Sequence, residues 1–376
     1  MPRCRVDRSI ERKVIEGFDF PLGVYPIEAM TPREGYTLAF EAADGGEADG
    51  PTDFGSSDDD DQRDDRPGGP RSGRGDRDDR DEARGDLEAW PDRYVWDIAI
   101  RASRVEALCR ALFALLPGRV YPILDFLGND AYREIDPYVA YDLVGQERFI
   151  EGLRLFRGFL FEDGLVGFGA MADEPFLYVF VDEHKIVTVR AESAMKERIE
   201  SVLAAFDLEE VEQIAGADGA PHEHRSVIEA PDDRPDLLTP EEIVEELKEM
   251  WGLSLNVDGE TNTDERGEDL GICGWRCVVR GTTTEGEVRY VEVLLTADCL
   301  NAAQDLAADA AEHVLSDDDS IEIDESALDD DEPAGELDII AADRLKPDEF
   351  EKLVREAVSK KVDPTIERVW AARRME

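Results

Sequence analysis

Apolar and polar residues follow two different periods along this chain, and the two periods predict strands and helices. Residues 94–100 alternate apolar and polar side chains, which is typical of a half-buried strand. Residues 102–116 place apolar side chains three and four positions apart, as on one face of a helix, until Pro117 and Gly118 end the pattern. Alternation returns over 119–127, so this region is expected to read strand, helix, strand.

The same patterns continue beyond this region. Residues 144–156 and 193–206 are expected to be helices, while 157–171 and 176–190 predict hairpins that turn near Asp163–Gly164 and at 182–184. Strands clustered beside flanking helices indicate an α+β fold with a largely antiparallel sheet.

A second patterned region begins at Thr239. Thr239, Pro240 and Glu242 form a helix start, in which Thr239 caps, Pro240 takes the first helical position and Glu242 completes a capping box. A hairpin is expected over 271–280 and 287–296, followed by a helix over 300–315, a strand over 337–341 and a helix over 347–359.

Acidic residues divide the chain into modules. The net charge is −49 over 376 residues, and the segments 41–92, 207–236 and 316–338 hold much of it between the patterned regions. Such segments bury too little apolar area to offset the entropy of ordering. We therefore expect two α+β modules of antiparallel hairpins with packed helices, separated by acidic disordered linkers. The expected domains are 1–206, with a disordered acidic insertion at 41–92; an acidic linker, 207–236; and a smaller α+β domain, 237–376, with an acidic loop at 316–338.

Composition also limits partners and location. A strongly negative chain is unsuited to direct contact with nucleic acid or anionic lipid, so a protein partner with a basic surface is the better expectation. Residues 1–19 lack the apolar core of a secretory signal, and the longest apolar runs are too short to cross a bilayer. Five scattered cysteines favour a reducing cytoplasm. The oligomeric state is left open.

One tyrosine-rich stretch is a candidate ligand or partner surface. Aromatic side chains with polar tips lie there among charged residues, in what Pro137 and the uneven spacing indicate is a loop. The alternative is that these tyrosines cover a sheet edge and hydrogen-bond locally. The candidate residues are Tyr121, Asp125, Tyr132, Arg133, Tyr138 and Tyr141.

Metal and cofactor sites are not expected. His222 and His224 are weak metal candidates because two imidazoles stand near carboxylates, but Ser226 occupies the place of the second histidine of a helical zinc-protease motif. His184 is expected to be a structural residue in a hairpin turn. Cys273 and Cys277 would lie about 13 Å apart along a strand, too far apart to hold one ion.

Three functions remain open from the sequence. The first is a non-catalytic protein-interaction or regulatory module, because no phosphate loop, nucleophile elbow or EF-hand spacing occurs. The second is an enzyme with a dispersed Asp/Arg/Tyr site near residues 121–141. The third is an acidic mimic of nucleic acid, although a mimic needs its charges on a rigid surface.

Overall fold

The computed structural model describes residues 4–43, 92–230, 234, 236–282, 288–316, 337–358 and 365–375. Most of the expected disordered insertion, 41–92, and of the expected acidic loop, 316–338, falls on residues 44–91 and 317–336, which lie outside the described residues. The described part confirms the α+β fold: seven α-helices accompany several sheets whose paired strands run antiparallel.

The larger sheet has nine strands, and the alternation read from the sequence determines which face is buried. Along β6, Val120, Pro122, Leu124 and Phe126 are buried, while the residues that alternate with them are partly exposed. In spatial order the strands are β13 (Leu253–Leu255), β7 (Ile135–Ala140), β6 (Arg119–Leu127), β9 (Val166–Asp173), β10 (Phe176–Val181), β11 (Val187–Glu192), β5 (Arg93–Ala99) and β4 (Gly35–Glu41), with β8 (Val144–Gly145) paired to β6.

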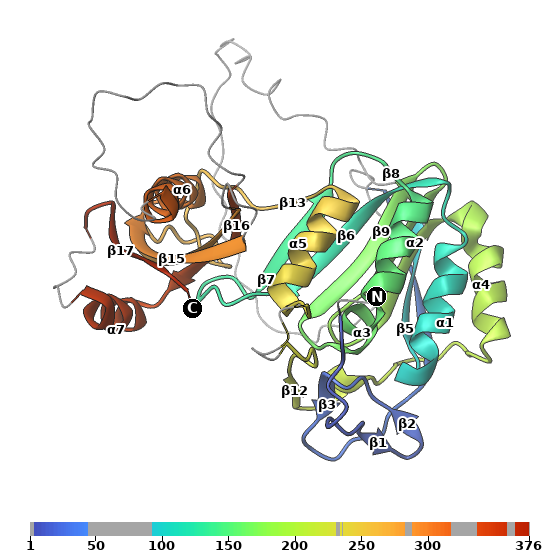
Figure 1. Ribbon diagram of the computed structural model, residues 1–376. Helices are drawn as coiled ribbons and strands as arrows, with labels where there is room; N and C mark the ends of the chain where they lie inside the picture. Colours follow the sequence, from blue (N-terminus) through green and yellow to red (C-terminus); the bar gives the residue numbers. More distant parts are fainter. Residues whose placement is uncertain are drawn as a thin grey trace, which may run out of the picture.

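Five helices cover the buried face of this sheet (Figure 1). Their apolar stripes form one core with the strands, in which Trp96, Phe113 and Phe168 are fully buried. Each such side chain contributes about 1.5–3 kcal/mol when it leaves water. The helices are α1 (Ala102–Phe113), α2 (Gln146–Leu155), α3 (Arg157–Glu162), α4 (Lys196–Ala205), which follows the 3-10 turn η2 (Ser193–Met195), and α5 (Pro240–Trp251).

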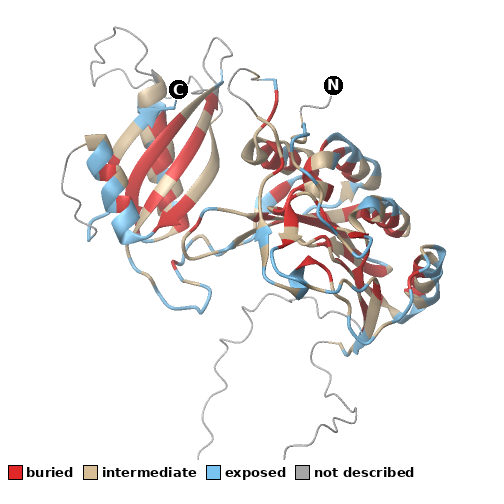
Figure 2. Ribbon diagram, turned by 90° about the horizontal axis from the view of Figure 1, so that it is seen from below, coloured by how far each residue is buried: buried red, intermediate tan, exposed pale blue. Residues whose placement is uncertain are grey.

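A four-stranded sheet forms the second body of the structure (Figure 2). Alternate residues of β15 face opposite helices: Val293 and Leu295 pack with α6 (Leu300–Ser316), whereas Leu294 packs with α7 (Pro347–Val358). No helix in the described part of the chain is long and apolar enough to cross a membrane. The strand order is β16 (Leu337–Leu345), β14 (Cys273–Thr282), β15 (Val288–Ala297) and β17 (Arg368–Arg374).

The segment expected as an acidic linker is ordered over residues 207–230. Its charged side chains stay at the surface, while Leu208, Ala217 and Val227 are buried. The short strand β12 (His222–His224) pairs with β3 (Val24–Pro26), next to the hairpin of β1 (Val14–Ile15) and β2 (Phe18–Asp19) and the 3-10 turn η3 (Ala217–Gly219). A few well-placed apolar residues and backbone pairing outweigh the like charges here.

Helix α5 begins as the sequence indicates but packs on the larger sheet. The Thr239 side chain accepts a hydrogen bond from the Glu242 amide, and the Glu242 carboxylate accepts one from the Thr239 amide. Ile243, Leu247 and Trp251 then join the core of the larger sheet, and β13 pairs with β7. The chain therefore passes to the smaller sheet after Leu255, later than the expected boundary at 236.

Three local expectations differ from the structure. Residues 157–162 form α3 instead of the first strand of a hairpin, because Phe159, Leu160 and Phe161 are all buried in the core. The tyrosine-rich loop includes the strand β7, in which Pro137 still accepts a hydrogen bond through its carbonyl from the Asn256 amide. Strand β17 has no counterpart in the expected elements.

Candidate metal centre

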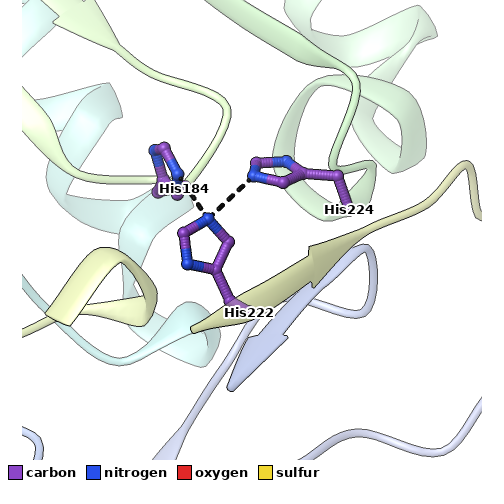
Figure 3. Close-up of side chains that lie close together, drawn as sticks. All are labelled: His184, His222 and His224. Carbon is purple, nitrogen blue, oxygen red and sulfur yellow. Dashed lines mark hydrogen bonds between the residues drawn. The ribbon is translucent and has the colours of Figure 1, made fainter. Parts of the chain in front are cut away.

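Three histidines from two distant segments meet at one point (Figure 3). His222 and His224 lie on β12, and because side chains two apart on a strand point to the same side, both imidazoles face the same way. His184 comes from the turn between β10 and β11, 38 residues earlier than His222. The two-residue repeat of a strand, and not the repeat of a helix, places His222 and His224 side by side.

A tight turn fixes the position of His184. The Asp182 carbonyl accepts a hydrogen bond from the Lys185 amide, and the Asp182 side chain accepts one from the Ile186 amide at 2.7 Å. Lys185 takes the left-handed conformation, with φ of +66°. Asp182 therefore stabilises the turn through two hydrogen bonds, and in this turn His184 faces β12.

The three Nε2 atoms converge. The Nε2 of His222 lies 3.0 Å from the Nε2 of His184 and 3.0 Å from the Nε2 of His224. Ligand nitrogens about 2.0 Å from a tetrahedral ion lie about 3.3 Å from one another, which is close to these separations. The imidazole rings meet at angles of 65–83° with centroids 4.7–4.9 Å apart, so they surround a point and do not stack.

The Nδ1 atoms of His222 and His224 show which nitrogen of each ring carries the hydrogen. His222 Nδ1 lies 2.8 Å from the Ala220 carbonyl and His224 Nδ1 lies 2.7 Å from the Gly164 carbonyl. A carbonyl oxygen can only accept, so both Nδ1 atoms carry the hydrogen, and in the neutral rings both Nε2 atoms present lone pairs. Two lone pairs facing each other at 3.0 Å repel unless a proton or a metal ion lies between them.

Carboxylates surround the third histidine. His184 Nδ1 lies 3.4 Å from both Asp182 Oδ2 and Glu183 Oε1. Burial opposes protonation of His184, but the Asp182 hydrogen bond and the charges of Asp182 and Glu183 outweigh it and raise its pKa. Burial and the neighbouring histidines lower the pKa of His224. Negative charge behind one ligand supports a cation bound at Nε2.

The geometry matches the requirements of a transition-metal site. Imidazole suits zinc, copper, iron and nickel, and three imidazoles leave a fourth position for water in a tetrahedral zinc site. An ion held here would join the β10–β11 turn to β12 and, through β12, to β3 of the N-terminal segment. Ala220, Gly164 and the Asp182–Glu183 pair would act as the outer partners that orient the rings.

The tyrosine-rich candidates do not form one site. Tyr121 and Asp125 lie on the face of β6 opposite the helices, whereas Tyr138 on β7 is buried beneath α5, with Lys248 Nζ 5.4 Å from its ring centroid. Tyr141 is 66% exposed and donates a hydrogen bond to Asn256. Burial and the charge of Glu183 raise the pKa of Asp125 to about 6.

Two of these candidates lie where the sheets meet. The ring centroid of Tyr132 lies 5.5 Å from the guanidinium carbon of Arg344 on β16. Arg133 donates from Nε to Asp136 Oδ1 at 2.6 Å. This junction, and not a surface loop, is the environment of residues 130–136.

The sequence pointed to two of the three convergent histidines but not to the third. The signal for His222 and His224 is a His-x-His pair on a strand, yet the surrounding acids favoured a solvated linker. Nothing local distinguishes His184 from other turn residues, because its partners are distant in sequence.

No protein-family model matches this chain, and neither the curated proteins nor the solved structures contain a significant match to it.

Proposed function

We propose that this protein binds a divalent transition-metal ion, with zinc as the first candidate, through His184, His222 and His224. The observation that supports the proposal most is the convergence of three Nε2 atoms whose partner nitrogens are occupied by outer acceptors. One proton could relieve only one of the two close Nε2 contacts. A metal ion accepts all three lone pairs at once.

The proposed role of the ion is to stabilise the fold. Its ligands would join the strand pair of β3 and β12 to the β10–β11 turn of the larger sheet. This role agrees with a non-catalytic interaction or regulatory protein. A site that assembles only in the folded chain contributes its binding free energy to stability.

Metal titration of the wild-type protein and of histidine variants tests the proposal. Tag-free wild-type protein should bind one equivalent of zinc by calorimetry and retain one zinc by elemental analysis after gel filtration. His184→Ala and His222→Ala should lose it. The chain has one further histidine, His313, which lies exposed on α6 and contacts its own helix through the Asp309 carbonyl, so His313→Ala is the matched control.

Two results would reject the proposal. The first is wild-type protein that retains no zinc at stoichiometric concentration. The second is zinc binding that survives in the variant lacking all three clustered histidines.

Location and partner are part of the proposal as well. All five cysteines are free thiols in the structure, which supports a reducing cytoplasm. The net charge of −49 supports a protein partner with a basic surface. Affinity capture at low and at moderate salt, followed by mass spectrometry, tests this part, since an electrostatic partner should be lost as salt rises.

A further inference from the structure

A small, partly enclosed cavity lies between the two sheets, away from the histidine cluster. Its volume is about 70 Å³, several times the roughly 10–15 Å³ that is needed to hold one water. The larger sheet supplies one wall through β6, β7 and α5, and the smaller sheet supplies the other through β16 and α6. Its polar and aromatic lining includes Phe126, Arg133, Asp136, Tyr138, Lys248 and Asp343.

Asp343 is the unusual residue of this cavity. It is 5% exposed, and its carboxylate makes no hydrogen bond or ion pair with any residue that the structure describes. Its cross-strand neighbour on β14, Arg276, donates instead to Glu292 Oε1 at 2.7 Å. Burying an ionised carboxylate without a partner costs free energy, and a cation bound in the cavity would offset this cost.

The cations that line the cavity are already occupied. Arg133 is paired with Asp136 at 2.6 Å, and Lys248 donates to Glu245 at 2.7 Å. Asp130, the other buried carboxylate nearby, is paired with Arg344. Apart from these pairs, the carboxylates of Asp343 and Glu241 face the cavity, and of these two only Asp343 is buried.

We propose that the cavity binds a small primary ammonium group, with Asp343 as its counter-ion and the rings of Tyr138 and Phe126 as aromatic walls. Ammonium groups bind both carboxylates and aromatic faces. The Tyr138 ring already faces one cation, since Lys248 Nζ lies 5.4 Å from its centroid. The acidic groups do not converge as metal ligands do: within the described residues the only groups close enough to hold an ion lie around His184. This favours an ammonium group over a metal ion.

Methylammonium is the probe for this site because its methyl protons report binding directly. Saturation-transfer NMR on full-length protein at pH 7.5 and constant ionic strength should show transfer to methylammonium. Asp343→Asn should abolish the transfer. Asp348→Asn, in the exposed first turn of α7, removes the same charge outside the cavity and should leave the transfer unchanged. Tetramethylammonium, which is too large and has no N–H donor, should show none.

The melting temperature is a second measurement, and it distinguishes a ligand-binding role of Asp343 from a purely structural one. If Asp343 serves a ligand, Asp343→Asn should raise the melting temperature of the free protein while it eliminates the methylammonium-induced rise seen with wild type. The proposal is overturned if wild type shows no transfer. Transfer that survives Asp343→Asn, or is equal for tetramethylammonium, overturns it too.

Discussion

Asp130 and Arg344 form a buried ion pair that joins the two sheets. Arg344 Nε lies 2.9 Å from Asp130 Oδ2 and 3.1 Å from Oδ1, and the Arg344 amide donates to the same carboxylate at 3.0 Å. The Asp130 side chain is 0% exposed and that of Arg344 is 5% exposed. Arg344 also donates from Nη1 to Asn262 Oδ1 and to the Thr263 carbonyl, so the pair is well satisfied.

Breaking this pair should destabilise the protein strongly. Arg344→Met leaves the Asp130 carboxylate buried without its partner, which typically costs about 3–5 kcal/mol. Urea unfolding followed by circular dichroism measures the loss. Arg355→Met is the matched control, because its pair with Glu351 on α7 is exposed and should contribute less than about 1 kcal/mol.

The double variant Asp130→Leu with Arg344→Met should recover part of that loss, because no charge is then left buried. A single variant no less stable than wild type would contradict the view that this pair joins the sheets.

Cutting the chain at residue 236 should damage the larger sheet. The cut removes α5 and β13, so the apolar surface that packs against Trp251 and Leu247 would be exposed. A fragment of residues 1–236 should therefore aggregate or melt without cooperativity, whereas residues 1–257 should melt cooperatively by circular dichroism. Equal and cooperative melting of the two fragments would show that α5 is dispensable.

Asp343 should make the protein less stable as the pH rises from acidic to neutral. Burial and the charges of Asp136 and Asp130 raise its pKa from the ordinary 3.8 to about 6, while Arg276 and Arg133 act in the opposite direction. Glu241 and Lys248 on α5 also face the cavity. The folded chain thus holds a proton that the unfolded chain releases between these values, and stability falls across this window.

Asp343→Asn should remove this dependence. Its gain over wild type should be roughly 2–3 kcal/mol at pH 7.5 and should approach zero near pH 4. Urea unfolding at both pH values measures it, with Asp348→Asn as the control. A gain that does not change with pH would exclude the raised pKa as its cause.

Zinc should raise the melting temperature through the histidine cluster. Binding to the folded chain alone stabilises it by about 2.7 kcal/mol when free zinc is 100 times its dissociation constant. A chelator should reverse the effect in wild type and in His313→Ala, and should change nothing in His224→Ala. Equal zinc responses in His224→Ala and His313→Ala would show that the ion acts elsewhere.

Local sequence patterns predict the helices and strands of this fold better than they predict which of these elements pack together. The capping residues of α5 and the alternation along β5 are local, and the structure reproduces both. Whether α5 packs on one sheet or the other depends on Trp251 meeting Phe149, and such tertiary contacts leave no local pattern. Residues 207–230 resemble a linker in sequence because their buried residues, such as Val227, are few and widely spaced.

The candidate site shows the same limit. His222 and His224 share one face because β12 is a strand, in which side chains two apart point to the same side. His184 joins them only through the turn of a separate hairpin. Asp343 likewise becomes a buried acid only because the larger sheet covers it.

X-ray absorption spectroscopy of the zinc-loaded protein tests directly whether the three histidines hold the ion. We predict a single site with three imidazole nitrogens at about 2.0 Å and one further light ligand in a tetrahedral arrangement. The imidazole scattering should disappear in the variant lacking His184, His222 and His224. A six-coordinate oxygen shell, or any sulfur ligand, would contradict a histidine-bound ion at this centre.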